Sequence, residues 1–365
     1  MDAMDLALRV AEARESRRLT QGELAQVVGM DRTVLAKIET GQRRVTALEL
    51  VDLARELHRR VEWFLLPRVD AVVQHRNRND DYSTRDIDTS LERVASDTAL
   101  LIDLGALDLP PRPRVFPMPS TVREAEELGA EIRRALSMEP VGPINDLVGV
   151  VARSGLLPFA ERLGESADAA SLVNGHFGIA IVNSDRAVGR RRLALAHELG
   201  HFLVDDQYST DFRVDSDDHD EKEARLDRFA RSFLLPADAI SQEWEILSGQ
   251  GLREAAVRLA SKYRVDMSTL AHRLRDLGIA DENAVNEVFK ARTTKSDIIE
   301  FDLVVPDDLS GTYLTREYQR AVIRAYKSED ISGERAISLF RGTITADDLP
   351  PLEPLSIQTL WSVAG

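Results

Sequence analysis

Residues 193–203 read Leu-Ala-Leu-Ala-His-Glu-Leu-Gly-His-Phe-Leu, a run of apolar, helix-forming residues that contains two histidines and one glutamate. His197 and His201 are four residues apart, so in an α-helix they lie on one face and one turn from each other. Both imidazoles can then reach the same metal ion. Glu198 can contact a metal-bound water without binding the metal itself. The stretch predicts a buried helix that carries a metal centre.

A centre with two histidines needs a third protein ligand and keeps a fourth position open for water. Residues 223–230 read Glu-Ala-Arg-Leu-Asp-Arg-Phe-Ala, which predicts a second helix with Glu223 and Asp227 one turn apart on the same face. We expect Glu223 to complete a His2Glu ligand set. We expect Asp227 to accept a hydrogen bond from the far nitrogen of a ligating imidazole. The alternative interpretation is a solvated acidic helix face, which is what most carboxylate pairs are.

Four segments around these residues together resemble the ImmA/IrrE family of metallopeptidases: Gly178-Ile179-Ala180-Ile181-Val182-Asn183, the arginine run 190–192 that leads into the motif, residues 223–230, and Leu234-Leu235-Pro236. The resemblance implies an apolar strand before the motif helix and a later helix that supplies a glutamate ligand. The chain has Asp227 where the family usually has asparagine, and it lacks the methionine before Pro236. Neither difference removes a metal ligand.

The HExxH pattern is that of zinc-dependent peptidases, in which the glutamate is the general base. Zn²⁺ would bring the pKa of its water close to neutrality, and Glu198 would move the proton from that water to the leaving amine. We expect Zn²⁺ as the cofactor, and a His2Glu set also accepts Mn²⁺. His176, Tyr208 and His219 are candidates for stabilising the oxyanion, on their nearness in sequence alone.

Residues 5–66 carry a second, independent signal. Thr20 and Glu23 have the spacing of a capping box at the start of a helix. Gly29 is free to adopt a positive φ at a turn, and Asp31 can cap the next helix. Two short helices joined by such a turn have the spacing of a helix-turn-helix, whose second helix enters the major groove of DNA.

This segment resembles the XRE, Cro-like repressor family at Leu19-Thr20-Gln21, Leu24-Ala25, Gly29, residues 38–41 and the closing helix 48–57. The resemblance implies operator DNA as a partner. The residues expected to face DNA are Gln21, Arg32, Thr33 and Lys37, with Arg43 and Arg44 near the phosphates. The alternative interpretation is a plain helical bundle that makes dimer contacts.

The charge of the chain limits how it can bind DNA. It has 47 Lys and Arg against 62 Asp and Glu, a formal net charge of −15, which disfavours diffuse binding of nucleic acid. Residues 1–68 hold 12 basic and 11 acidic side chains, so the excess acid lies elsewhere. We therefore expect weak non-specific binding and a homodimer that binds a palindromic operator.

Length and composition set further bounds. A chain of 365 residues is expected to form two or three domains, and the absence of cysteine excludes disulfides, thiolate nucleophiles and Cys-ligated zinc. No apolar run is long enough to span a membrane and no cleavable signal pattern is present, so we expect a cytoplasmic protein without a membrane partner.

We expect a mainly α, multidomain protein. Its parts are an all-α helix-turn-helix domain over 1–68, a helical and proline-rich linker over 69–120, an α+β zincin-like metallopeptidase domain over 121–285, and a small C-terminal α/β tail of unknown role over 286–365. Shorter patterns predict amphipathic helices over 91–102 and 121–137, two helices over 257–278 that could pass for another helix-turn-helix, a strand over 298–305 and helices over 317–326 and 332–340. The proline-dense residues 109–119 predict a spacer rather than a PxxP ligand. The acid-rich residues 205–221 predict a solvated loop beside the cleft.

Two functions fit these patterns. In the first, the chain is a DNA-binding transcriptional regulator with a zinc-dependent endopeptidase domain that cleaves a repressor, an antitoxin or itself in a stress or mobile-element response. In the second, it is a repressor or antitoxin-like regulator whose metal domain senses a ligand or binds a partner without efficient proteolysis. The Glu198→Gln variant separates them, because it should keep metal and DNA binding and lose proteolysis.

Overall fold

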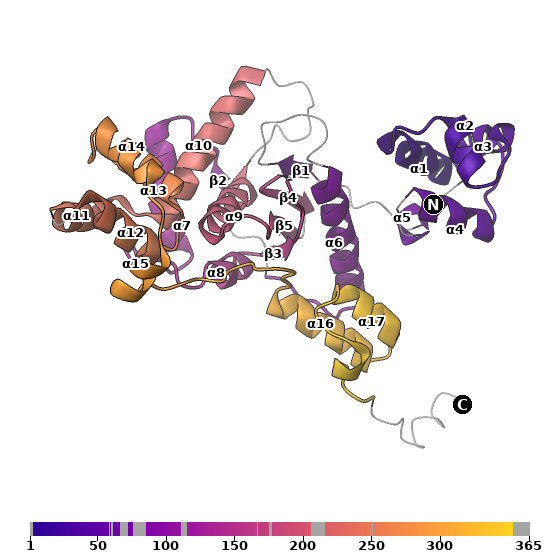
Figure 1. Ribbon diagram of the computed structural model, residues 1–365. Coiled ribbons are helices and arrows are strands. Elements are labelled where there is room, and N and C mark those ends of the chain that lie inside the picture. Colours follow the sequence, from indigo (N-terminus) through magenta and orange to yellow (C-terminus); the bar gives the residue numbers. More distant parts are fainter. Residues whose placement is uncertain are drawn as a thin grey trace. The chain divides into compact units, whose positions relative to one another are not determined.

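The computed structural model describes residues 3–57, 59, 61–65, 72–75, 85–110, 115–165, 167–174, 177–205, 216–249 and 251–352. The chain forms two compact units, Met1–Val69 and Asp70–Gly365 (Figure 1). Both units are rich in helix, which confirms the prediction of a mainly α, multidomain protein. Among the described residues, none of the helices combines the length and the apolar character needed to cross a membrane.

The regular elements in the described part of the first unit are all helices: α1 (Ala3–Ser16), α2 (Gln21–Val27), α3 (Arg32–Glu39), α4 (Ala47–Glu56) and α5 (Val61–Leu65). The capping box that was predicted at Thr20 and Glu23 is formed, and Asp31 caps α3 by accepting from the Thr33 amide at 2.7 Å. Gly29 has a φ of +67° in the turn between α2 and α3, as its place in the sequence predicted. Leu24 of α2 and Leu35 of α3 are fully buried where the two helices meet.

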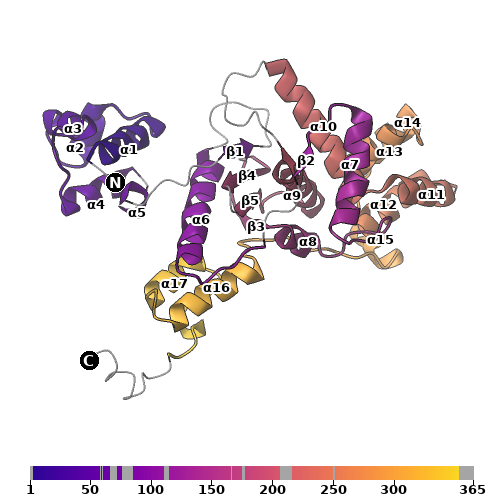
Figure 2. The ribbon, with the colours of Figure 1, turned by 180° about the vertical axis from the view of Figure 1, so that it is seen from behind.

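A four-stranded sheet forms the centre of the second unit, in the order β1 (Val72–His75), β4 (Ala169–Asn174), β5 (Phe177–Asn183) and β3 (Leu156–Glu161). Strand β5 is antiparallel to β4 and parallel to β3, and all seven of its residues are buried. The apolar strand expected before the motif helix is therefore confirmed. Helix α6 (Arg85–Asp103) covers one face of the sheet and α9 (Val188–Leu203) the other (Figures 1 and 2).

The remaining elements complete the second unit. They are the small parallel pair β2 (Phe116–Pro117) and β6 (Val204–Asp205), and the helices α7 (Val122–Ala135), α8 (Leu147–Arg153), α10 (Ser216–Leu234), α11 (Ala237–Ser248), α12 (Leu252–Tyr263), α13 (Met267–Leu277), α14 (Glu282–Lys290), α15 (Lys295–Glu300), α16 (Arg316–Lys327) and α17 (Gly333–Leu339), with a 3-10 turn η1 (Ala346–Asp348). The helices predicted over 91–102, 121–137, 257–278, 317–326 and 332–340 are confirmed.

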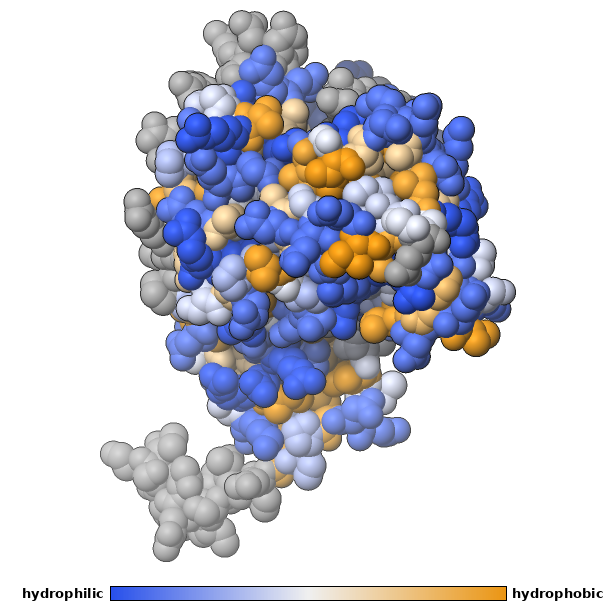
Figure 3. Space-filling model, turned by 90° about the vertical axis from the view of Figure 1, so that its left-hand side faces the viewer, coloured by the Kyte–Doolittle hydropathy of each residue, from blue (hydrophilic) through white to orange (hydrophobic). Residues whose placement is uncertain are grey.

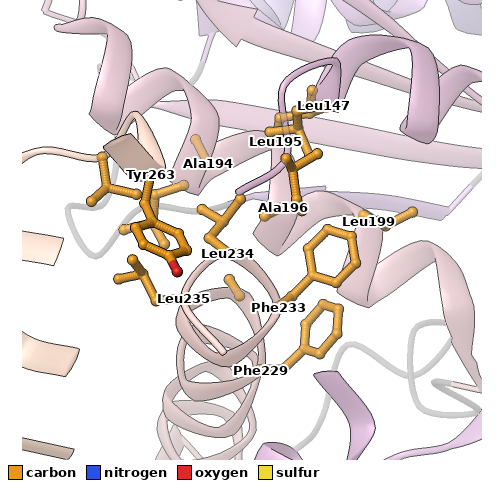
Figure 4. Close-up of a cluster of buried hydrophobic side chains, with 14 of the residues drawn as sticks. Leu147, Ala194, Leu195, Ala196, Leu199, Phe229, Phe233, Leu234, Leu235 and Tyr263 are labelled. Carbon is orange, nitrogen blue, oxygen red and sulfur yellow. The ribbon is translucent and has the colours of Figure 1, made fainter. Parts of the chain in front are cut away.

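Helix α10 packs between α7 and α9, and this contact forms the main core of the unit. Figure 4 shows Leu195 and Leu199 of α9 near Phe229 and Phe233 of α10, whose rings stack with centroids 5.8 Å apart. Gly200 permits the close approach, since a Cβ there would lie 2.7 Å from the ring of Phe229. The positions of the α9 and α10 side chains are therefore fixed against each other by a buried, close-packed apolar interface.

Two arginines near the N-terminal end of α9 join this helix to distant parts of the chain. Arg192 is fully buried, and it donates to Asp308 at 2.8 Å and to the Ile144 carbonyl at 2.5 Å. Arg191 donates to the Asp308 carbonyl at 2.9 Å. The C-terminal residues are thus part of the framework that holds the motif helix, and they lie in the same compact unit as that helix.

The C-terminal helices also contact α6 and β3 through buried charges. Arg341, 5% exposed at its side chain, bonds Asp97 at 3.0 Å and also pairs with Glu161. Arg335 bonds the other oxygen of Asp97 at 2.9 Å. This cluster attaches the chain after α15 to the sheet layer.

Two expectations need correction. Residues 295–300 form helix α15 rather than the start of a strand over 298–305, because Thr294 and Asp297 form a reciprocal capping box and Asp297 also accepts from Arg253 at 2.7 Å. Val304 and Val305, which gave the run its strand-like appearance, are exposed. In the acidic stretch 205–221, residues 206–215 lie outside the described residues, and the part from Ser216 onward is the first turn of α10 rather than loop.

Figure 3 looks onto the side of the unit that carries α11 to α15, and it shows a mostly hydrophilic surface with small, separate apolar areas. Ile246 and Ile299 are the most exposed large apolar side chains on these helices, at 61% and 82%. Single exposed apolar residues of this kind are normal on a protein surface.

Candidate metal centre

Three donor atoms from two helices meet at one point. His197 and His201, on α9, bring their Nε2 atoms to 3.1 Å from each other. Glu223, on α10, places one carboxylate oxygen 3.1 Å from His197 Nε2 and the other 3.3 Å from His201 Nε2. All three ligand atoms lie within 4.8 Å of one another. Donors about 2.0–2.1 Å from a tetrahedral zinc ion are themselves about 3.3 Å apart, so the spacing fits such an ion.

Asp227 fixes the orientation of the first histidine. Its Oδ1 atom lies 2.9 Å from His197 Nδ1, the ring nitrogen that faces away from the other donors. A proton on Nδ1 satisfies this contact and leaves the lone pair of Nε2 facing Glu223. Two acceptors would then face each other at 3.1 Å, which is unfavourable unless a cation lies between them. The donor set therefore fits a metal ion, and the acidic pair of α10 faces the histidines rather than solvent.

Glu223 is a carboxylate in this environment. Burial alone would raise its pKa, but hydrogen bonds and charge from His197 and His201 hold the pKa below its ordinary value. An ionised carboxylate is the form that binds a divalent metal.

Glu198 is fully buried and follows the first candidate donor in the sequence, and its two carboxylate oxygens differ in their hydrogen bonding. Its Oε2 accepts a hydrogen bond from the Ser171 hydroxyl of β4 at 2.5 Å. Its Oε1 is buried and has no hydrogen-bond partner within the described part of the chain. Buried carboxylate oxygens are rarely left unpaired, which makes Oε1 unusual. Ser171 holds Oε2 in place, and Oε1 is available to take a proton.

Sequence reasoning missed Ser171. Residues 169–173 read Ala-Ala-Ser-Leu-Val, and the only signal in them is a hydroxyl within an otherwise apolar strand. That signal does not say which partner the hydroxyl has, because the partner comes from a helix more than twenty residues later in the chain.

The three oxyanion candidates are not tested by the structure. His176 and Tyr208 lie outside the described residues. His219 belongs to α10, but its side chain is not among those described.

In the first unit, the residues expected to face DNA fall into two groups. Arg32, Thr33 and Lys37 on α3 and Arg44 after it are exposed. Gln21 and Arg43 are instead engaged within the unit: Gln21 donates to Glu39 at 2.8 Å, and Arg43 donates to Glu49 at 2.8 Å.

Comparison with protein families identifies a known domain in each of the two segments that the sequence patterns singled out. Residues 151–275 match the family model of the IrrE N-terminal-like domain, and residues 10–64 match that of a helix-turn-helix domain. The chain carries an IrrE-like domain and a helix-turn-helix domain. Both resemblances seen in the sequence are confirmed.

The IrrE-like match contains α9 and α10, which carry the three candidate donors, and the strands β3, β4 and β5. It also includes α12 and most of α13, so residues 257–275 belong to the IrrE-like domain rather than to a second helix-turn-helix. A search of curated proteins found no match. Among solved structures, Bacillus thuringiensis PlcR in complex with the peptide PapR7 and DNA aligns with 93% of this chain and 92% of its own, at 11% identity and a TM-score of 0.19.

Proposed function

We propose that the chain is a DNA-binding transcriptional regulator whose IrrE-like domain is a zinc-dependent endopeptidase that cleaves a repressor, an antitoxin or the chain itself. The observation that carries the proposal is the meeting of His197, His201 and Glu223 at one point, with the buried carboxylate of Glu198 next in sequence to the first ligand. The stress or mobile-element setting is part of the proposal and comes from the family resemblance.

Each residue of the centre has one task in this proposal. The two histidines and Glu223 hold the ion, and Asp227 keeps His197 in the tautomer that binds it. The ion, Zn²⁺ or Mn²⁺, would activate a water and polarise the scissile carbonyl. Glu198 takes the proton of that water on Oε1, while Ser171 holds Oε2, and it then passes the proton to the leaving amine.

For the helix-turn-helix domain, we propose that α3 enters the major groove with Arg32, Thr33 and Lys37, and that Arg44 contacts phosphate. Gln21 and Arg43 were assigned to DNA from the sequence, and both now have internal carboxylate partners. We keep them as contacts that use their remaining N–H donors, since each side chain has more donors than these bonds occupy. A homodimer on a palindromic operator supplies the affinity that a near-neutral domain lacks alone.

The first test is the metal content of the untagged protein, measured by elemental analysis beside Glu223→Ala. We expect about one zinc or manganese per chain in the natural protein and a loss of most of it in the variant. A matched control is Glu221→Gln, an exposed carboxylate two residues earlier on α10, which should leave the metal content unchanged.

The second test is proteolysis by Glu198→Gln. This variant should keep its metal and its operator binding and lose cleavage by a factor on the order of 10² to 10⁴, the usual contribution of a general base. If the variant regulates its promoter as the natural protein does, the metal domain works without proteolysis, and the second function, a ligand-sensing or partner-binding regulator, replaces the first.

A further inference from the structure

Strand β4 pairs with a neighbouring strand on each of its two sides. Its residue Ser171 joins it to the candidate metal centre by donating to Glu198. One edge pairs with β5, where Ser171 lies opposite Ala180. The other edge pairs with β1, where Ser171 lies opposite Gln74. Because the Ser171 hydroxyl is 2.5 Å from Glu198, the backbone that pairs with this second edge runs beside the proposed base.

A sheet edge in this position is suited to hold a peptide. Backbone N–H and C=O groups along the edge can pair with an extended chain of any sequence. Neighbouring strands lie about 4.8 Å apart, so a peptide paired with β4 is one strand spacing from Ser171. Hydrolysis of a peptide bond needs this kind of fixed, extended backbone next to the reacting groups.

A segment of the chain itself already occupies that edge. Val72–His75 forms β1 and pairs with β4 in antiparallel register from Val173 to Ala170. The segment immediately follows the first compact unit, which contains the helix-turn-helix domain. It lies outside the residues that match the IrrE-like family model.

We propose that the β1 side of β4 is the peptide-binding edge of the metal centre, and that Val72–His75 occupies it as an intramolecular competitor of substrate. A protein substrate pairs with β4 only after this segment leaves. A tethered segment acts at an effective concentration on the order of millimolar, so it weakens the apparent affinity of any substrate by the ratio of that concentration to the segment's own dissociation constant. This inference rests on the proposed function only in calling the displaced partner a substrate.

The test measures binding of a labelled peptide with the sequence of residues 70–77, Asp-Ala-Val-Val-Gln-His-Arg-Asn, by fluorescence anisotropy. All proteins carry Glu198→Gln so that the peptide stays intact. The opening variant adds Val73→Pro and Gln74→Pro. Alternate residues of a strand donate to one neighbour, so this pair removes a donated N–H whichever residue supplies it. The matched control, Val73→Thr with Gln74→Ser, changes the same side chains and keeps both N–H groups.

We expect the peptide to bind the opening variant at least tenfold more tightly than it binds the protein with the natural segment. Its affinity for the matched control should equal its affinity for the protein with the natural segment. A peptide with N-methyl groups on its third to fifth residues should not bind any of them, because it cannot donate to β4. Equal affinity for all three proteins, or no binding to the opening variant while its metal content is normal, overturns the proposal.

A second opening variant keeps the test sound if the prolines prevent folding. It replaces the segment by Val72→Gly, Val73→Ser, Gln74→Gly and His75→Ser, residues of low strand propensity. Because binding is measured without hydrolysis, failure here is separable from failure of the proposed function. Tight binding to the opening variant with no cleavage when Glu198 is restored supports the edge and rejects the peptidase.

Discussion

His197 contacts each of the other donors of the candidate metal centre and also Asp227. Its Nδ1 faces Asp227 at 2.9 Å, and its Nε2 faces Glu223 and His201, each at 3.1 Å. His201 differs, because its Nδ1 is buried without a hydrogen-bond partner in the described part of the chain. Among the described residues, Asp227 is therefore the one carboxylate that holds an imidazole at its Nδ1 atom, on the side away from the other donors.

We predict that Asp227→Ala lowers the zinc affinity by about 10- to 100-fold, as loss of such a support usually does. Asp227→Asn should retain most of the affinity, because its amide oxygen can still accept from Nδ1. The affinity is measured by competition with a chromogenic chelator. Asp220→Asn, an exposed carboxylate on the same helix, is the control. Equal affinities for the alanine variant and the natural protein would contradict the role given to Asp227.

At the scale of elements, helix α9 depends on contacts beyond its own sequence. Arg190 and Arg192 are near neighbours in the chain, and they differ in environment. Arg192 is fully buried with Asp308, whereas the Arg190 side chain is 44% exposed and pairs with Asp168. The two arginines therefore form a natural pair for comparing a buried and a surface ion pair.

We predict that Arg192→Ala lowers the free energy of unfolding by about 3–5 kcal/mol, because it leaves the Asp308 carboxylate and the Ile144 carbonyl without their buried partner. Arg190→Ala should cost about 1 kcal/mol or less, as surface pairs do. Urea unfolding of both variants gives the comparison. Similar losses in the two would show that burial does not decide the strength of these pairs.

The sequence predicted the elements that have a strong periodic pattern or a clear cap. The motif helix, the strand before it and the caps at Thr20 and Asp31 depend on nearby residues, and all are found. The strand over 298–305 was wrong because a local cap and Arg253 override its apolar appearance. Strand β1 was not predicted, since its pairing depends on β4, about one hundred residues away in the chain.

The same reasoning applies to the site. Spacing placed His197 and His201 on one helix face and Glu223 and Asp227 on another, because each pair is one turn of a helix apart. The need for a third ligand then led to the expectation that the two faces meet. Ser171 and the contacts of Arg192 could not be predicted, since they join segments whose meeting only the tertiary fold decides.

On the scale of the whole molecule, buried charges join the C-terminal helices to the sheet layer. Burial alone would raise the pKa of Glu161, but Arg341 and Arg93 hold the pKa below its ordinary value. A folded-state pKa below that of the unfolded chain stabilises the fold at pH values above about 4.3, the unfolded value for a glutamate. That contribution is lost as the pH falls below this value toward the folded-state pKa.

We predict that Glu161→Gln lowers the free energy of unfolding at pH 7 and that the difference from the natural protein shrinks as the pH falls below about 4.3. Denaturant unfolding between pH 7 and about pH 3 gives the measurement, because the predicted loss begins below the unfolded-state pKa of a glutamate. Glu165→Gln, at an exposed position four residues later, should show no such trend. A constant difference across this range would mean that Glu161 contributes through packing rather than charge.

DNA binding is also a property of the whole molecule, because the net charge of −15 opposes it. We predict that Arg32→Ala with Lys37→Ala abolishes operator binding and leaves the metal content unchanged. Arg17→Ala with Arg55→Ala, exposed cations outside α3, should weaken binding much less. Band-shift titration at several salt concentrations tests this. Operator binding that survives the first double variant would move the recognition surface to another helix.

Gly200 occupies one of the two positions that the HExxH pattern leaves open, yet in this chain that position is not free. A methyl group there would lie 2.7 Å from a carbon of Phe229, so it would push α10 away from α9. Glu223 is on α10, and His197 and His201 are on α9. The missing methyl group therefore sets the spacing of the two helices, and through that spacing it sets the separation between the donor atoms of Glu223 and those of the two histidines.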